Sequence, residues 1–133
     1  MEVIVDTNVL VYETVEDSIY HEEVVEKLNR FSRIYISVNI LIEFILVLKK
    51  LGLDEKFICD KVVELLDRSK IELVNVRKSD IERAIEIIMK EKSSMLRVND
   101  KLVLSLASKL GIPLYTYDKQ LKFQAEKFDV NLV

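Results

Sequence analysis

Residues 99–121, "NDKLVLSLASKLGIPLYTYDKQL", combine a helical pattern with a short run of strand-forming residues. Apolar side chains recur along one helical face, and the pattern ends at a glycine and a proline, which stop helices. The following "PLYT", at 113–116, has the composition of a short strand. A helix that leads directly into a strand is typical of an α/β fold. The apolar face comprises Leu102, Val103, Leu106, Ala107 and Leu110.

The same alternation of short strands and helices runs through the rest of the chain. Four more segments look like strands: "EVIV" at 2–5, "IYI" at 34–36, "IELV" at 71–74 and "VNLV" at 130–133. Between them, apolar residues recur with the 3.6-residue period of a helix. This order predicts a three-layer α/β/α sandwich, with a mostly parallel sheet of about five strands covered by helices on both faces.

The composition is that of one globular domain spanning residues 1–133. Half of the 133 residues are hydrophobic and 32% are charged, and two glycines and one proline leave little room for a linker. The longest mostly apolar run, 40–48, is far shorter than the roughly 20 residues of a membrane span. The N-terminal residues have no basic start of a signal peptide, and the single Cys59 excludes an internal disulfide. We therefore expect a cytoplasmic protein without a membrane partner.

The net charge of −3 argues, taken alone, against nucleic acid as a partner. The argument weakens if some of the acids hold a metal ion. Setting four carboxylates aside leaves 19 of the 23 acids, against 20 Lys and Arg. Bulk charge therefore does not decide between a nucleic-acid enzyme and other classes.

Four acids fall at positions that would meet at one edge of the predicted sheet. Asp6 comes directly after the first strand and Asp118 just after the fourth, and parallel strands end at the same edge. Asp100 opens a helix that runs back along the sheet, so the start of that helix lies at this edge too. Glu43 lies about 9 Å along its helix from the expected N-cap, Ser37, and its side chain can still reach the edge.

Converging carboxylates need a counter-charge, because close negative charges repel and one of them would otherwise hold a proton. Oxygen ligands without histidine or cysteine suit Mg²⁺ or Mn²⁺ rather than zinc. One or two such ions would activate a water and stabilise the leaving oxygen of a phosphodiester. The four acids therefore indicate a divalent-metal site.

Three segments together resemble the PIN-domain nucleases, and among them the compact VapC-like toxin ribonucleases. The stretch "DTNVLVY" at 6–12 is similar to the opening motif of the family, and "SVNILIE" at 37–43 to its serine followed by an acid. Residues 99–121 are similar to the helix of the third acid, the next strand and the T-x-D ending. Each motif is weak alone, but the ordered set covers almost the whole chain.

This resemblance implies a Mg²⁺- or Mn²⁺-dependent endoribonuclease that leaves a 5′-phosphate and a 3′-hydroxyl on its RNA substrate. It also implies the toxin of a type II toxin–antitoxin pair, with a small cognate antitoxin covering the active site, and often a homodimer. Asn8 and Thr116 match polar positions that orient carboxylates or water, and Asp6 and Asp100 match the direct ligands. Carried over from this resemblance, the catalytic and metal-binding acids would be Asp6, Glu43, Asp100 and Asp118.

Simpler interpretations of these acids stay open. Asp6 and Asp118 have the positions of helix caps, and Asp100 that of an acid stabilised by a helix dipole. Glu43 could lie on the solvent-exposed side of its helix. The basic residues before Asp100 could bind RNA or belong to a solvated loop; they are Lys90, Lys92 and Arg97.

Other functions also fit the pattern. A PIN-like protein could serve as a binding scaffold that has lost turnover, although all four acids are present. It could also be a nuclease of RNA processing rather than a toxin. A receiver-like phosphoacceptor is set aside, because it would have an acid pair after the first strand and a lysine after the fifth, and Asp6-Thr7-Asn8 supplies one acid.

Overall fold

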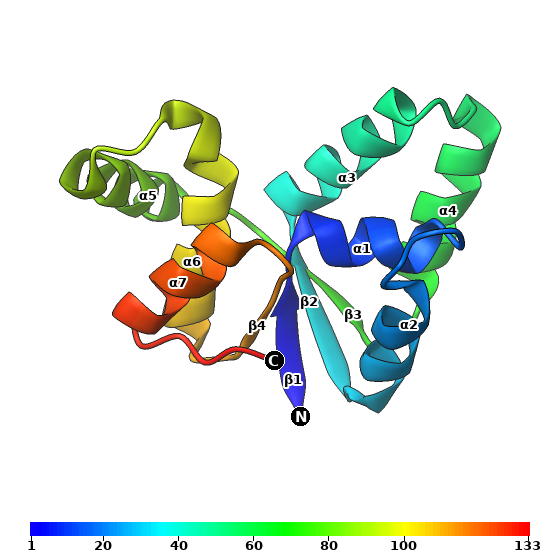
Figure 1. The fold of residues 1–133 in the computed structure, drawn as a ribbon, viewed down its shortest axis with the longest axis horizontal. Helices are drawn as coiled ribbons and strands as arrows, with labels where there is room; N and C mark the ends of the chain where they lie inside the picture. The colour runs from blue at the N-terminus through cyan, green and yellow to red at the C-terminus, as the bar shows by residue number, and fades with distance from the viewer.

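A computed structural model describes all residues, 1–133, as a four-stranded parallel sheet enclosed by helices (Figure 1). The strand order is β3-β2-β1-β4. Because β1 pairs with β2 on one side and with β4 on the other, the direction of strand addition reverses beside β1. The strands are β1 (Glu2–Val5), β2 (Arg33–Ser37), β3 (Ile71–Val74) and β4 (Leu114–Tyr115).

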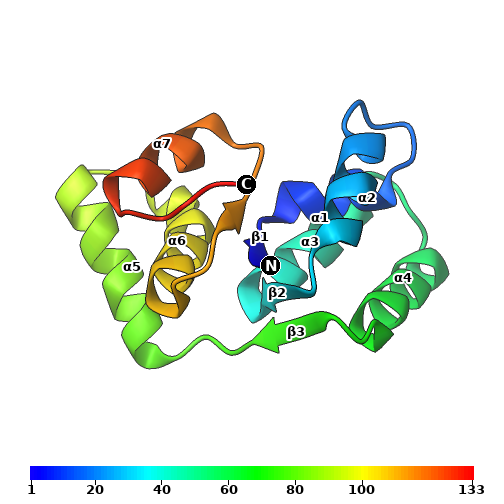
Figure 2. The ribbon, with the colours of Figure 1, turned by 90° about the horizontal axis from the view of Figure 1, so that it is seen from below.

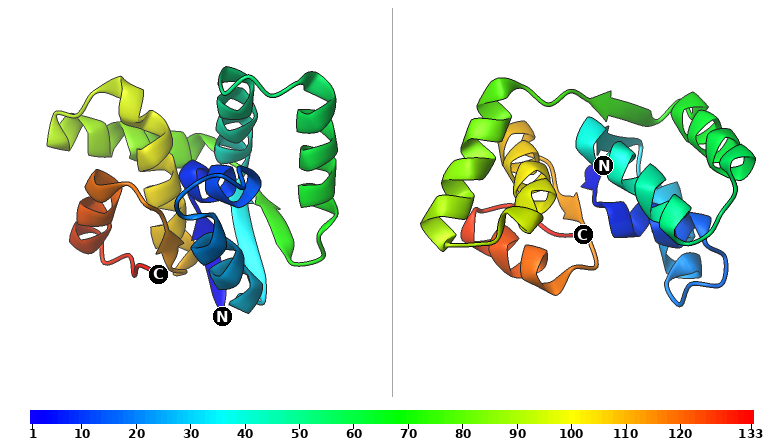
Figure 3. Two further views of the ribbon diagram at one scale, coloured as in Figure 1. Left: turned by 45° about the vertical axis from the view of Figure 1, so that its right-hand side comes forward. Right: turned by 90° about the horizontal axis from the view of Figure 1, so that it is seen from above.

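Seven α-helices and one short 3₁₀ helix connect and follow the strands. Helices α1 to α4 lie on one side of the sheet and α5 to α7 on the other, as the views from below and above both show (Figures 2 and 3). The predicted three layers are therefore present. The helices are α1 (Thr7–Thr14), α2 (His21–Arg30), α3 (Val38–Lys50), α4 (Glu55–Asp67), α5 (Lys78–Glu91), η1 (Met95–Arg97), α6 (Val98–Leu110) and α7 (Lys119–Lys127).

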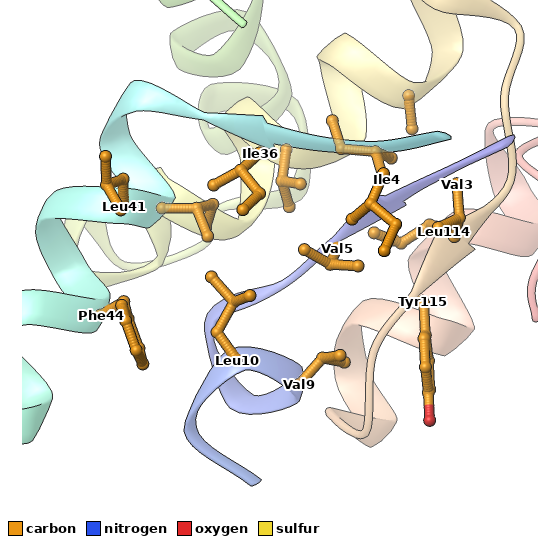
Figure 4. Packing of buried hydrophobic residues seen from close by; sticks show 14 of the residues in the cluster. Val3, Ile4, Val5, Val9, Leu10, Ile36, Leu41, Phe44, Leu114 and Tyr115 are labelled. Atoms are coloured by element: carbon orange, nitrogen blue, oxygen red, sulfur yellow. The ribbon is translucent and has the colours of Figure 1, made fainter. Parts of the chain in front are cut away.

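The core lies between the sheet and these helices. The side chains of β1 are buried on both faces, which is why "VIV" is a continuous apolar run rather than an alternating one. Phe44 of α3 and Tyr115 of β4 are among the largest fully buried side chains, and the buried side chains of β1, α1, α3 and β4 gather in one region (Figure 4). Replacing a buried phenylalanine such as Phe44 with alanine typically costs about 3–5 kcal/mol.

Helix α6 ends as its sequence predicts. Gly111 is the C-cap and has a φ of +66°, in the left-handed region that glycine adopts without a steric penalty. Its N–H donates to Ala107 O over 2.9 Å, and the chain then turns through Pro113 into β4. The glycine therefore sets the point at which the chain leaves the helix and enters the sheet.

The predicted fifth strand at 130–133 is wrong. This segment makes a single bridge, between Leu114 and Leu132, and forms no strand. Its partner β4 is only two residues long, and the chain turns sharply at Asp129, which has a φ of +55°, just before the segment begins. Too few residues therefore run alongside β4 to build a ladder.

None of the helices is long and apolar enough to cross a membrane.

Candidate functional site

The four acids lie around one cavity of about 250 Å³ at the carboxyl end of β1. Each comes from a different helix: Asp6 is the N-cap of α1, and Asp118 is the N-cap of α7. Asp100 lies in the first turn of α6, and Glu43 lies in the second turn of α3. The cavity also has Thr7, Asn8, Val11, Tyr12 and Val47 in its wall.

The sheet brings Asp6 and Thr116 together. The backbone N–H of Asp6 donates to Tyr115 O over 3.0 Å, which continues the pairing of β1 with β4. The Thr116 hydroxyl then donates to Asp6 Oδ2 over 2.7 Å, and Asn8 Nδ2 donates to the same oxygen over 3.2 Å. The Thr7 N–H donates to Asp6 Oδ1 over 2.8 Å. Asp6 is thus both a helix cap and a wall of the cavity, so the two interpretations of this residue do not compete.

Asn8 and Thr116 also hold the segment that carries Asp118. The backbone N–H of Tyr117 donates to Asn8 Oδ1 over 3.1 Å, and that of Asp118 donates to the Thr116 hydroxyl over 3.0 Å. Asp118 itself accepts the Leu121 N–H over 3.0 Å, as an N-cap does. The two polar residues expected beside the acids therefore fix the position of two of them.

Glu43 is oriented by two asparagines that we did not single out in the sequence. Asn99 Nδ2 donates to Glu43 Oε2 over 2.8 Å, and Asn39 Nδ2 donates to Asn99 Oδ1 over 3.2 Å. Asn39 lies one turn before Glu43 on the same helix, and Asn99 is the neighbour of Asp100. Their positions in the sequence, close to Glu43 and Asp100, could have identified both asparagines as candidate site residues.

Arg97 lies inside the acidic group rather than on an outward loop. Its guanidinium is 2.9 Å from Asp100 Oδ2 and 3.4 Å from Asp118 Oδ2. The other two basic residues singled out in the sequence, Lys90 and Lys92, are exposed and do not line the acid cavity. Lys90 instead lines a larger cavity, of about 620 Å³, between α5 and α7.

A buried lysine anchors the start of α6. Lys101, the residue after Asp100, is fully buried, and its Nζ lies 3.2 Å from Glu91 Oε2. Gln124 Nε2 of α7 donates to the same oxygen over 2.7 Å. This contact joins α5, α6 and α7 next to Asp100. This contact could not be predicted from the sequence, because Lys101 has the spacing of a surface position.

Three of the acids carry raised pKa values. Desolvation raises the pKa of Asp6, and the hydrogen bonds from Thr116 and Thr7 only partly oppose it. Desolvation and then the charge of Asp6 raise the pKa of Glu43. The pKa of Asp100 rises to about 6, through desolvation and then the charge of Asp6, against the opposing effect of Arg97. The cavity thus concentrates negative charge that favours a cation.

Asp118 differs from the other three acids. Desolvation acts to raise its pKa, but the Leu121 N–H and the Arg97 guanidinium outweigh it, and the pKa lies below its usual value. Asp118 therefore loses its proton at a lower pH than the other three acids do.

The donors around the cavity fit a hard divalent cation. All four acids supply carboxylate oxygens, and the buried Thr7 hydroxyl in the same wall has no hydrogen-bond partner. As the side chains stand, no three His, Cys, Asp or Glu residues form a cluster that could hold a metal ion. The Arg97 guanidinium contacts carboxylate oxygens of Asp100 and Asp118. A metal ion here would compete with that guanidinium.

Comparisons with known proteins point in one direction. The model of the PIN domain family matches residues 3–127. No curated protein sequence gives a significant match. Among solved structures, VapC20 of Mycobacterium tuberculosis, described as a sarcin-ricin loop cleaving toxin, superposes with a TM-score of 0.81 at 15% identity, over 92% of this chain and 94% of that one.

Two toxin–antitoxin structures also superpose on the chain. VapBC2 of Rickettsia felis, bound to a DNA fragment from its promoter, has a TM-score of 0.72 at 18% identity, over 100% of this chain and 98% of that one. VapBC-1 of nontypeable Haemophilus influenzae has a TM-score of 0.72 at 15% identity, over 100% and 97%. At these identities the superpositions establish the shared fold.

Proposed function

We propose that this chain, which belongs to the PIN domain family, is a divalent-metal-dependent endoribonuclease that acts in the cytoplasm as the toxin of a toxin–antitoxin pair. The observation that carries the proposal is the meeting of four acids from four separate helices around one cavity. Helix caps and surface acids have no reason to meet in this way. The fold shared with VapC20, a toxin described as cleaving the sarcin-ricin loop, supports RNA as the substrate.

The four acids have two roles in the proposed reaction. Asp6 and Asp100 would hold Mg²⁺ or Mn²⁺ directly, and Glu43 and Asp118 would complete the site, through water where they do not reach the ion. An ion bound there would supply an activated water and would neutralise charge on the scissile phosphate. The protein supplies geometry: Thr116 and Asn8 hold Asp6, and Asn99 holds Glu43. Attack on the phosphorus would leave a 5′-phosphate and a 3′-hydroxyl.

A small antitoxin is the proposed protein partner. The structures of the VapBC proteins contain toxin–antitoxin pairs, and the chain covers nearly all of the matched toxin-fold chains. Apolar side chains beside the site are also solvent-exposed, among them Ile42 and Leu46 on α3 and Leu96 on η1. Exposed apolar side chains that lie next to one another, as Ile42 and Leu46 do one turn apart on α3, are typical of surfaces that bind other chains. They support both an antitoxin and a homodimer.

The test is cleavage of end-labelled RNA in Mn²⁺ or Mg²⁺, with EDTA as the metal-free control. The substrates are a sarcin-ricin loop hairpin, bulk tRNA and ribosomal RNA. Asp6→Asn should abolish cutting, whereas the matched Asp60→Asn, an identical change on an exposed position of α4, should leave it unchanged. Cutting that persists in Asp6→Asn or in EDTA would rule out the proposed site.

A binding scaffold without turnover is the alternative outcome. It would be favoured by intact protein that neither cuts any of these RNAs nor binds Mn²⁺, as measured by calorimetry. A non-toxin processing nuclease would instead cut RNA with the expected metal dependence but leave growth unaffected when expressed. The growth assay therefore separates the toxin from the processing enzyme.

A further inference from the structure

Four of the five tyrosines gather on one side of the acid cavity. The rings of Tyr20 and Tyr117 are stacked, with centroids 4.4 Å apart and planes 25° apart. Tyr12 lies 5.2 Å from Tyr20 and 5.3 Å from Tyr117, and Tyr115 lies 5.6 Å from Tyr117. They come from α1, the residue before α2, β4 and the segment between β4 and α7. Segments distant in the sequence thus supply one aromatic cluster.

The tyrosine cluster is continuous with the acidic site. Tyr12 lines the same cavity as Asp6, Glu43, Asp100 and Asp118. Tyr117 lies between Thr116 and Asp118 in the chain, and its backbone N–H is held by Asn8. A ligand whose reacting group occupies the acid cavity therefore has the aromatic rings directly beside it.

The inner part of the cluster is rigid and the outer part is open. Tyr115 is only 1% exposed. Tyr117 donates its hydroxyl to Glu23 Oε1 over 2.7 Å, so the 2.9 Å contact between the two hydroxyls is a donation from Tyr115 to Tyr117. Tyr20 is 37% exposed and stacks on this fixed base. The structure thus presents a ring to solvent on a preorganised support.

Two lysines lie among these rings. Lys122 Nζ is 5.7 Å from the centroid of Tyr117, and Lys27 Nζ is 5.4 Å from that of Tyr115. Glu23 brings a negative charge, but it is engaged by the Tyr117 hydroxyl and lies 3.3 Å from Lys27. Aromatic rings interleaved with cations are the pattern that binds single-stranded nucleic acid, through base stacking and phosphate contacts.

We propose that the tyrosine cluster is a nucleobase-binding subsite, in which an unpaired base next to the scissile phosphate stacks on Tyr20 and Tyr12. This inference rests on the proposed function, because it takes RNA as the ligand of the acid cavity. It adds that the substrate is single-stranded or flipped out at the site, since a base within a duplex cannot reach a ring. The cations favour this anionic ligand over an antitoxin side chain as the occupant.

The absence of tryptophan allows a direct test, because tyrosine provides the fluorescence and Tyr35 is the single tyrosine outside the cluster. Asp6→Asn protein carrying Tyr35→Phe is titrated in EDTA with single-stranded 12-nucleotide homopolymers of A, U and C. An abasic oligomer of equal length supplies the phosphates without the bases. Titration of free N-acetyl-tyrosinamide corrects for light absorbed by the nucleobases. We expect quenching by at least one homopolymer and none by the abasic oligomer.

Variants of Tyr20 then test whether its ring is responsible for binding the base. Tyr20→Ala should weaken binding of the quenching homopolymer roughly ten-fold or more, measured by anisotropy of an end label, whereas Tyr20→Phe should bind like the parent. Ile19→Ala is the matched control, because the Ile19 side chain is next to Tyr20 in the sequence, is 88% exposed and carries no ring. Thermal melts of all variants, each expected to be folded, separate lost binding from lost structure.

Three results would overturn the subsite: quenching by the abasic oligomer equal to that by RNA, no quenching by any homopolymer, and unchanged binding by Tyr20→Ala. Metal-dependent cutting by the wild-type protein would leave the proposed function standing in each case. If wild-type protein also fails to cut, both proposals fall together.

Discussion

The Thr116 hydroxyl donates a 2.7 Å hydrogen bond to Asp6 Oδ2, across 110 positions of sequence. The same hydroxyl accepts the Asp118 N–H over 3.0 Å, so it connects two acids of the site. It can do so because β1 and β4 are adjacent parallel strands that end side by side. The positions of Asp6 and Asp118 therefore depend on the Thr116 hydroxyl as well as on the pairing of the backbones of β1 and β4.

Removing that hydroxyl should destabilise the protein. Thr116→Val keeps the shape of the side chain but leaves the nearly buried Asp6 carboxylate without its best donor. Loss of hydrogen bonds to a charged buried group should cost about 2–3 kcal/mol in the free energy of unfolding, measured by urea denaturation. Thr116→Ser, which keeps the hydroxyl, should cost less than half as much. Equal losses in the two variants would mean that packing, and not the hydrogen bond, is the important contribution.

Neutralising Asp100 should stabilise the metal-free protein. Its raised pKa means that the charged carboxylate is unfavourable in the folded state, even with Arg97 beside it. In EDTA at pH 7.5, we expect Asp100→Asn to raise the free energy of unfolding by roughly 1–3 kcal/mol, and Tm by several degrees. Mn²⁺ should then stabilise the wild type and leave the variant unaffected. A variant that melts lower in EDTA and still responds to Mn²⁺ would place Asp100 outside the metal site.

The same residue should make stability depend on pH. The folded state holds the Asp100 proton up to about pH 6, whereas the ordinary pKa is 3.8, so the folded state binds more protons between these values. Stability from this group is therefore fully present below about pH 4 and is lost as pH rises through about 6. The free energy of wild-type unfolding in EDTA, minus that of Asp100→Asn, should fall across this window. A flat difference would contradict the raised pKa.

Arg97 should compete with the metal ion. Its guanidinium contacts Asp100 and Asp118, so Arg97→Gln removes a cation that occupies their oxygens. We expect roughly ten-fold tighter Mn²⁺ binding by calorimetry and, because the acids lose their counter-charge, lower stability in EDTA. Arg83→Gln, an exposed position on α5, removes the same charge as a control. Weaker Mn²⁺ binding by Arg97→Gln would show instead that the arginine positions the acids.

Lys90 and Lys92 stay proposed RNA contacts. Lys90 lines the larger cavity together with Lys119 and Lys127, so a phosphate backbone could follow that surface. If Lys90 contacts one phosphate, Lys90→Gln should reduce the slope of log K against log salt by about 0.7 for single-stranded RNA, and Lys92→Gln likewise. Lys56→Gln on α4 is the control. An unchanged slope would exclude a phosphate contact at the residue tested.

The fold and the meeting of the acids were predictable because both follow from local patterns. Asp6 comes directly after β1 and Asp118 three positions after the end of β4, and the edge at which parallel strands end follows from their direction. The contacts of Arg97 were not predictable, because they depend on the 3₁₀ turn of η1 leading straight into α6. The tyrosine cluster likewise needs α1 and the residue before α2 to lie against the segment that follows β4. The strand predicted at 130–133 failed because composition does not reveal how few residues lie beside β4.

The two-residue strand β4 also bears on how such a protein is made. Asp6 emerges early in synthesis, but it meets Thr116 only after 110 further residues have been added. Contacts between distant positions form late, because the intervening chain must first be ordered. A nascent chain on the ribosome therefore carries Asp6 and Glu43 without the rest of the site. The proposed nuclease would thus stay inactive towards the RNA of the ribosome that is producing it until β4 joins the sheet.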